Sequence, residues 1–303
     1  MTLFKFLSHK QDGNQLIIYL WEVSMKHEIR IHNGTVIPEL GYRIDRDNKK
    51  TMYEDILTAL RAGFRHFDIA CDAETERIAG KAFADSGVPR FELFLTMKLG
   101  NEDHGYERAA RAFEKSLKHV GTDYADLYLI NWPNPIQFRD RYETNSVDTW
   151  RALESIYKSG RARAIGVANY EARHIEFLLD HAEIAPMVNQ ARIYPGFPFK
   201  DNLDCAHEHN ILTEGFLPPM HDDILNSKEL KIFAGKYKVS PRMICIRYLL
   251  EKKCIALLQG RNEEELRNTV KAFDFTISPE DMLYLDAMKN YGLENINPDT
   301  CDF

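Results

Sequence analysis

The regular alternation of short apolar segments with longer amphipathic segments most constrains the fold of this chain. The apolar segments have the length of strands, and the segments between them repeat apolar residues at helical spacing. Strands that alternate with helices form parallel sheets, and eight such units predict a closed (β/α)₈ barrel, or TIM barrel, in preference to an open doubly wound sheet. The strands are expected at 39–43, 64–68, 92–98, 124–130, 162–167, 186–190, 211–216 and 254–258.

The segment before the first of these strands predicts a β-hairpin. Asn33-Gly34 separates two alternating runs, and this dipeptide favours a primed turn because both residues tolerate positive φ. We expect the hairpin to close the base of the barrel. Residues 1–24 precede the regular pattern and are interpreted as an N-terminal extension, with Met25 as an alternative start. Residues 25–303 are interpreted as a single barrel domain.

Composition argues against several classes of protein. The net charge is −7, with acidic and basic residues mixed along the chain, so we expect no nucleic-acid or membrane partner. No apolar run approaches the roughly 20 residues that span a bilayer. The 5 cysteines form no CxxC pair, which disfavours a disulfide framework or a metal site and favours a cytoplasmic location.

Polar residues at the ends of five predicted strands mark one end of the barrel as the candidate site. They are Asp68, Lys98, Asn131, Asn169 and Gln190. Barrel enzymes place their chemistry at the carboxyl ends of the strands. We expect the aspartate and the lysine to pair, because either charge buried alone costs several kcal/mol. Two separate, solvated surface charges are the alternative.

Several motifs in this order resemble the aldo-keto reductase family. They are DHGYE at 103–107, RAIGVAN at 163–169, VNQ at 188–190, FDF at 273–275 and the tail NPDTCDF at 297–303. The resemblance extends over nearly the whole chain from Met25 and implies the barrel fold. It also implies an ancestral activity, the reduction of a carbonyl group by a nicotinamide cofactor.

The resemblance implies a catalytic site that has lost its acid. In the family a tyrosine five residues after the aspartate protonates the carbonyl oxygen, a lysine lowers the pKa of that tyrosine, and a histidine orients the carbonyl. Asp68 and Lys98 match this pattern, whereas Ala73 stands at the tyrosine position and Asn131 at the histidine position. General acid catalysis contributes about 10²–10⁴ to a rate, so ordinary carbonyl reduction is expected to be lost or strongly reduced.

The resemblance implies a mixed nucleotide site. Asn169 and Gln190 match the residues that hold the nicotinamide carboxamide, and Phe216 matches the aromatic ring that stacks on the nicotinamide. Near the first strand, the run from Gly41 to Asp45 replaces a family glycine that lets the backbone approach the cofactor, and we expect the bulky Arg43 side chain to intrude.

The clamp for the 2′-phosphate of NADP is the part of the nucleotide site that differs most. Gln259 replaces its lysine and Glu265 replaces its arginine. A carboxylate repels a phosphate, so NADP(H) is disfavoured. Glu265 would instead accept a hydrogen bond from an unphosphorylated ribose, so binding of NAD(H) stays compatible with the sequence.

Three functions are compatible with these residues. The first is a pseudoenzyme or repurposed homologue that binds a small molecule in the barrel mouth or an unidentified protein partner. The second is an atypical or weak NAD(H)-dependent carbonyl oxidoreductase. The third is a non-redox enzyme in which Lys98, beside Asp68, acts as a base or a Schiff-base nucleophile.

Overall fold

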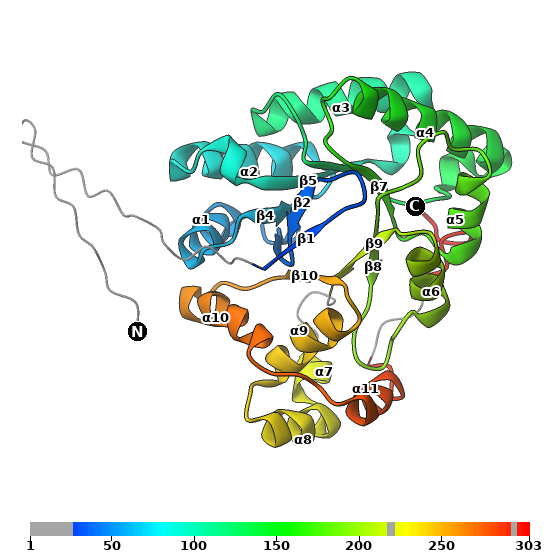
Figure 1. The fold of residues 1–303 in the computed structure, drawn as a ribbon. Coiled ribbons are helices and arrows are strands. Elements are labelled where there is room, and N and C mark those ends of the chain that lie inside the picture. Colours follow the sequence, from blue (N-terminus) through cyan, green and yellow to red (C-terminus); the bar gives the residue numbers. More distant parts are fainter. Residues whose placement is uncertain (1–26, 217–221, 292–295) are drawn as a thin grey trace, which may run out of the picture.

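A closed barrel of eight parallel strands forms the centre of the molecule, as the sequence predicts (Figure 1). The computed structural model describes residues 27–216, 222–291 and 296–303. Each strand expected from the sequence overlaps one observed strand. The barrel strands are β3 (Leu40–Arg43), β4 (His66–Asp68), β5 (Phe94–Leu99), β6 (Leu127–Ile130), β7 (Ile165–Ala168), β8 (Val188–Arg192), β9 (Leu212–Phe216) and β10 (Ile255–Leu258).

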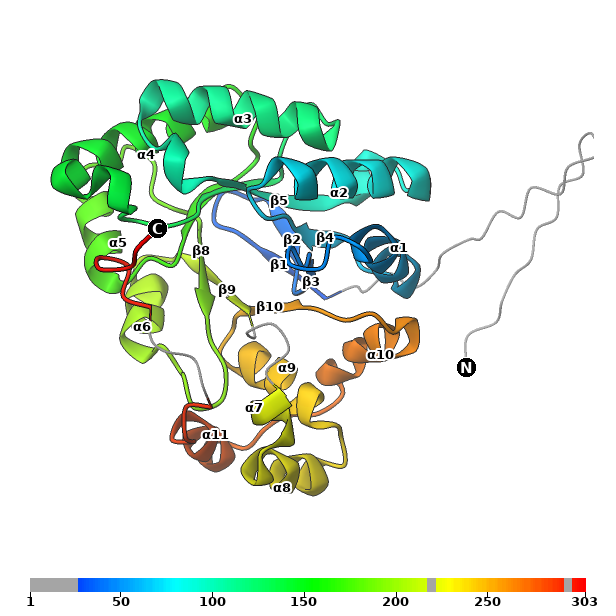
Figure 2. The same cartoon turned by 180° about the vertical axis from the view of Figure 1, so that it is seen from behind.

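Helices surround the barrel and cover its outer face (Figures 1 and 2). The α-helices are α1 (Met52–Ala62), α2 (Ala73–Ser86), α3 (Tyr106–Val120), α4 (Tyr142–Lys158), α5 (Ala172–Leu179), α6 (Lys200–Glu208), α7 (Asp222–Asn226), α8 (Lys228–Tyr237), α9 (Pro241–Glu251), α10 (Glu263–Asn268) and α11 (Pro279–Asp286). Short 3₁₀ helices lie at Arg90–Glu92, Asn101–Asp103, Ile136–Arg141 and Thr269–Phe273.

The N-terminal hairpin lies across the base of the barrel (Figure 1). It pairs β1 (Glu28–Arg30) with β2 (Val36–Pro38), and Asn33 donates a hydrogen bond to the carbonyl of Arg163, shortly before β7. The prediction of a primed turn at Asn-Gly is wrong. Gly34 has a φ of 92°, whereas Asn33 is not in the left-handed region, and the Gly34 N–H donates to the Ile31 carbonyl. The turn therefore needs positive φ at the glycine alone.

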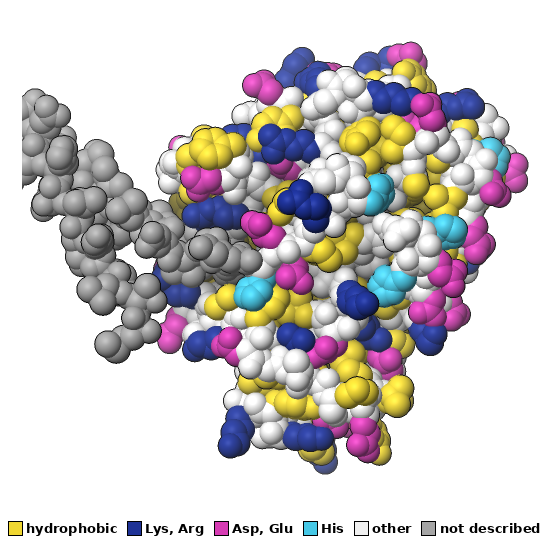
Figure 3. Space-filling model, viewed as in Figure 1, with side chains coloured by type: hydrophobic (Ala, Val, Ile, Leu, Met, Phe, Trp, Pro, Cys, Tyr) yellow, Lys and Arg dark blue, Asp and Glu magenta, His cyan; other side chains and the backbone are white. Residues whose placement is uncertain are grey.

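The hairpin side of the molecule carries interspersed charges, with Lys and Arg beside Asp and Glu (Figure 3). Within the described ranges, no helix is long and apolar enough to cross a membrane. In the same part of the chain, no group of three or more His, Cys, Asp and Glu side chains is placed to hold a metal ion. The expected N-terminal extension, residues 1–24, lies outside the described residues, and the domain boundary after it stays a prediction.

The barrel interior is apolar except for a small polar layer. His66, Thr96 and Glu214 are all fully buried there, on three different strands. Gly41 in β3 leaves space for this layer, because a Cβ at that position would lie 2.7 Å from Nδ1 of His66. The layer continues toward the carboxyl ends of the strands, where the candidate site lies.

Candidate active site

Asp68 and Lys98 form a buried ion pair at the carboxyl ends of neighbouring strands. β4 and β5 run in parallel with Asp68 opposite Thr96, which places Lys98 one inward-facing position further along. The ammonium of Lys98 donates a hydrogen bond to Oδ1 of Asp68, and the two side chains are 6% and 1% exposed. The expected pairing is confirmed, and the alternative of two solvated surface charges is wrong.

Asp68 also joins two other strands to the site. Gln190, at the end of β8, donates from Nε2 to Oδ1 of Asp68 at 3.1 Å. Arg43, the last residue of β3, places its Nε 3.6 Å from Oδ2 of Asp68. The guanidinium of Arg43 lies over the ring of Phe216, 4.4 Å from the ring centroid. Arg43 therefore intrudes into the barrel mouth, as expected from the sequence.

A neutral His66–Glu214 pair lies beneath Asp68. Nε2 of Gln190 donates to Oε2 of Glu214 at 2.8 Å, and Oε1 of Glu214 is 3.4 Å from Nε2 of His66. Burial, with a contribution from the Asp68 charge, raises the pKa of Glu214 to about 8. Burial lowers the pKa of His66 to about 4. Both side chains are therefore neutral near pH 7, so their contact is not a salt bridge despite its short distance.

Sequence reasoning missed Glu214 and His66. The alternation of side chains along a strand predicts the place of His66, because it lies two residues before Asp68 and so faces the same side of β4. Glu214 is a carboxylate inside an otherwise uncharged strand that ends at Phe216, and such a residue needs a buried partner. The identity of that partner depends on a contact between strands far apart in the sequence.

Ala73 is the first residue of α2 and is partly buried. The carboxylate before it, Asp72, caps the helix by accepting a hydrogen bond from the Thr75 N–H at 3.0 Å. Lys49 binds both Asp72 and Glu74, at 2.8 and 2.6 Å. The carboxylates on either side of Ala73 are thus engaged in a cap and in a surface ion pair.

Asn131 and Asn169 meet through the backbone of the former. Nδ2 of Asn169 donates to the carbonyl oxygen of Asn131 at 2.8 Å. Asn169 has a φ of 60°, a left-handed conformation that asparagine tolerates better than most residues. The side chain amide of Asn131 makes no hydrogen bond within the described part of the chain. The structure thus connects all five predicted strand-end residues. Asp68, Lys98 and Gln190 meet through their side chains. Asn169 donates hydrogen bonds to the backbone carbonyls of Gln190 and Asn131.

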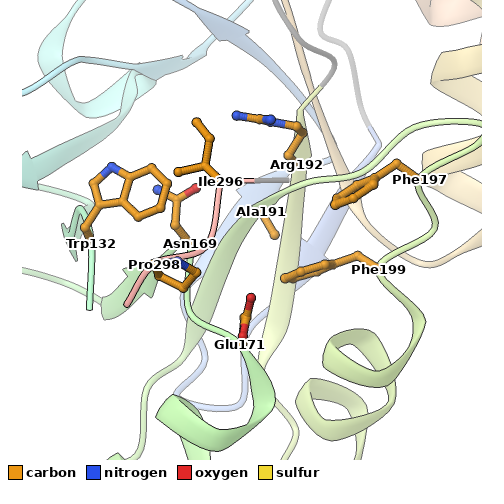
Figure 4. Close-up of a pocket in the computed structure, with 9 residues that line it drawn as sticks. All are labelled: Trp132, Asn169, Glu171, Ala191, Arg192, Phe197, Phe199, Ile296 and Pro298. Carbon is orange, nitrogen blue, oxygen red and sulfur yellow. The ribbon is translucent and has the colours of Figure 1, made fainter. Parts of the chain in front are cut away.

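A pocket opens beside this cluster, between the end of β6, the end of β8 and the C-terminal tail (Figure 4). The side chains that line it are mainly apolar. They are Trp132, Asn169, Glu171, Ala191, Arg192, Phe197, Phe199, Ile296 and Pro298. Arg192, which lines the pocket, stands opposite Phe216 in the β8–β9 register, and Phe216 lies under the Arg43 guanidinium.

The predicted site of the nucleotide phosphate is acidic. Glu265 lies exposed in the first turn of α10, where Glu263 and Glu264 precede it. Arg261 contacts Asp45 at 3.2 Å and Asp55 at 3.4 Å. Arg267 contacts Glu263 at 2.6 Å. The two arginines nearest to the substituted positions are therefore engaged by carboxylates.

The fold and site define a parallel (β/α)₈ barrel with an ionic cluster at the carboxyl ends of its strands, the arrangement of barrel enzymes. The family model described as "Aldo/keto reductase family" matches residues 30–290. The chain belongs to the aldo-keto reductase family, as its motifs suggest.

Curated relatives and solved structures agree with this assignment. The chain is 37% identical over 279 residues to a glyoxal reductase of Bacillus subtilis (strain 168), covering 91% of this chain and 98% of the relative. It is 34% identical to a 9,11-endoperoxide prostaglandin H2 reductase of Trypanosoma cruzi (strain CL Brener), covering 86% and 90%. The crystal structure of an aldo-keto reductase from a Medee basin deep-sea metagenome library superposes with a TM-score of 0.82 at 32% identity, covering 91% and 100%.

The family implies a nicotinamide nucleotide, and the residues of this chain fit one poorly in the arrangement observed. The Phe216 face that would stack on the nicotinamide is covered by the Arg43 guanidinium. The Nε2 group of Gln190 donates to Asp68 and Glu214. Three glutamates open α10 where a phosphate clamp would need cations. The side chains of the mouth thus contact one another where the family holds its cofactor.

Proposed function

We propose that this chain is an aldo-keto reductase homologue that no longer performs tyrosine-dependent carbonyl reduction and uses its barrel mouth to bind a small molecule. The observation that carries the proposal is Ala73, whose methyl group stands where the family's proton donor belongs. Loss of a general acid lowers a rate by about 10²–10⁴.

The mouth offers a poor replacement for this acid. Burial raises the pKa of the Cys71 thiol to about 11, although the nearby Lys98 charge opposes the shift. Glu214 carries a proton near pH 7 but is fully buried beneath Asp68 and Gln190. Among the described residues, neither of these groups offers a substrate carbonyl in the pocket an accessible acid of suitable strength.

The test is an assay of the full chain with NADH and with NADPH, using glyoxal and 4-nitrobenzaldehyde as substrates. We expect no nucleotide oxidation above the rate without protein. Clear turnover of either aldehyde would overturn the proposal.

A gain-of-function series separates the missing acid from the blocked cofactor face. The triple variant Ala73→Tyr, Asn131→His, Arg43→Gly restores the family's acid and histidine and uncovers Phe216. We expect at least about a 10²-fold gain in reduction over the same background with Ala73→Phe, because only the phenol has a proton to give. Equal rates for the Tyr and Phe variants would mean that the position does not serve proton transfer in this barrel.

A second candidate function is NAD(H)-dependent carbonyl reduction by an atypical route. The observation that favours it is the survival of Asn169, Gln190 and Phe216 at the mouth, in a chain 37% identical to a glyoxal reductase. A solved aldo-keto reductase of Bombyx mori, 26% identical, is in complex with NADP. Fluorescence titration of Trp132 and Trp150 with NADH and NADPH distinguishes the candidates. Submillimolar binding of NADH would favour the second one.

A further inference from the structure

Among the described residues, the guanidinium of Arg43 has a counter-charge but no hydrogen-bond acceptor. Its Nε is 3.6 Å from Oδ2 of Asp68, beyond hydrogen-bond length, and its other side faces the Phe216 ring. Across the described residues, no oxygen accepts a hydrogen bond from this group. The side chain is 28% exposed, so part of it is open to the barrel mouth. A guanidinium carries five N–H donors, so this one can bind an acceptor from solution.

The charges around Arg43 leave the inner mouth positive. Asp68 is the carboxylate that faces the cations of the cluster, and Lys98 already donates to its Oδ1. Glu214 holds its proton near pH 7 and contributes no charge there.

The more distant charges do not reverse this balance. Asp45 is engaged with Arg261 at 3.2 Å. Burial lowers the pKa of Arg43, the attraction of Asp68 opposes this, and Arg46 and Arg192 lower it further. The carboxylates that act on Arg43 are Asp68, which it shares with Lys98, and Asp45, which is engaged with Arg261. An anion beside the Arg43 guanidinium would therefore be stabilised.

The pocket beside Arg43 supplies an apolar surface for the rest of such a ligand. Trp132, Phe197, Phe199 and Ile296 project toward the same space (Figure 4). Arg192 stands at the border of this pocket and opposite Phe216 in the strand register. Ligand pockets of this kind combine mostly apolar walls with a few placed polar groups.

We propose that the barrel mouth binds a small organic carboxylate. Its two oxygens accept hydrogen bonds from the Arg43 guanidinium above Phe216, and its apolar body extends into the pocket lined by Trp132 and Phe197. Guanidinium matches a carboxylate with two parallel N–H groups, which favours this anion over a neutral amide. The inference deepens the proposed function by naming the class of ligand, and it rests on that function.

Benzoate and its neutral analogue benzamide are the probes, measured by isothermal titration calorimetry with the full chain and no nucleotide. We expect benzoate to bind with a Kd of about 1 mM or tighter, and benzamide at least about tenfold more weakly, since one charge-assisted hydrogen bond is worth about 1.5–3 kcal/mol. Equal affinities for the two probes, or no benzoate binding at about 10 mM, would overturn the proposal.

Variants locate the binding site. Arg43→Gln is expected to weaken benzoate binding at least about tenfold and to leave benzamide binding unchanged. The benzoate affinity of Arg43→Lys should lie between those of Arg43→Gln and the parent, because lysine keeps the charge but lacks the planar pair of N–H donors. The matched control is Arg151→Gln, which removes an exposed arginine on α4 that contacts Asp148 at 3.6 Å. The control should bind benzoate like the parent. Parental affinity in Arg43→Gln would place the anion elsewhere and refute the assignment.

The two proposals fail in different experiments. Carboxylate binding is measured without nucleotide or carbonyl substrate, so aldehyde turnover by the parent chain would refute the proposed loss of reduction without touching this measurement. Absence of benzoate binding in a chain that is also inactive would refute the ligand class and leave the loss of catalysis standing.

Discussion

The single buried carboxylate of Asp68 is the counter-charge of two cations, Lys98 and Arg43. Lys98 donates to its Oδ1 and Arg43 lies near its Oδ2, with Asp68 only 1% exposed. Asp68→Asn removes the negative charge and leaves both cations without it. Breaking a buried pair in this way costs about 3–5 kcal/mol, so we expect a loss of that size in the free energy of unfolding, measured by urea denaturation.

Asp85 provides the matched control for Asp68. It binds Lys81 at the surface, where the two side chains are 41% and 66% exposed. Exposed pairs contribute about 0–1 kcal/mol, so Asp85→Asn should change stability little. Similar losses for the two variants would show that burial does not set the strength of the Asp68 pair.

Part of the site could be predicted residue by residue from the positions of polar residues at strand ends. Asp68, Lys98 and Gln190 could be placed together because parallel strands in a barrel bring their carboxyl ends to one rim. The contact between Arg43 and Phe216 was harder to foresee, since it depends on the rotamer of a long side chain. The hydrogen bond from Asn169 to the Asn131 carbonyl was missed because backbone acceptors leave no pattern in a sequence.

The inner polar layer gives strands β4 and β9 a pH-dependent contribution to stability. Glu214 has a folded pKa of about 8 against an unfolded value near 4.5. Between these values the folded chain keeps a proton that the unfolded chain loses, so stability falls as pH rises. His66, with a folded pKa of about 4 against 6.5, acts in the opposite direction below pH 6.5. The two effects therefore oppose each other up to about pH 6.5.

Above pH 6.5 only the Glu214 effect remains. The slope is about 1.4 kcal/mol per pH unit well below the folded pKa and half of that at pH 8, so the parent should lose about 1.5 kcal/mol between pH 6.5 and 8. Glu214→Gln should remove this slope, as measured by urea unfolding across the range. The exposed Glu208 on α6 supplies the control Glu208→Gln, which should keep it. A Glu214→Gln variant with the parental slope would contradict the assigned titration.

Elements were predicted from the sequence where their pattern of buried residues is distinctive. The β-strands were found because strands buried on both faces form continuous apolar runs. For helix α9 the sequence predicted only the beginning, from Ser240 and Pro241. In the structure Ser240 accepts a hydrogen bond from the Met243 N–H, and Pro241 lies in the first turn. The apolar residues of α9 lie on all sides of the helix and not on one face, so the helical period of apolar residues in its sequence is weak.

At the scale of the whole molecule, the C-terminal tail forms a wall of the barrel mouth. Both ribbon views place the tail beside α5 (Figures 1 and 2). Arg139 donates to the carbonyl of Cys301 at 2.6 Å, and the Phe303 ring packs edge-on to Trp132 with centroids 4.9 Å apart. Since Trp132 and Pro298 both line the pocket, the position of the tail sets the shape of the pocket. The tail motif was visible in the sequence, but its contacts were not.

Asp299 holds this tail through three side chains. Its Oδ1 accepts hydrogen bonds from Asn134 at 2.9 Å and from Nε2 of His174 at 3.1 Å, and Oδ2 accepts from Arg173 at 2.6 Å. Partial burial alone would raise the pKa of Asp299, but these hydrogen bonds hold it well below its usual range. A depressed folded pKa stabilises the docked tail above the unfolded value near 4, and this contribution is lost as pH falls below it.

Asp299→Asn should therefore loosen the tail without unfolding the barrel. The carboxylate is about one-third exposed, so the expected loss is about 1 kcal/mol after solvent screening. Hydrogen exchange of residues 296–303, followed by mass spectrometry at neutral pH, should then be about fivefold faster than in the parent. Asp302→Asn is the control, because Asp302 is exposed on the same tail and forms no ion pair with the described residues. Equal exchange in the two variants would mean that the aromatic contact with Trp132, and not Asp299, holds the wall of the pocket in place.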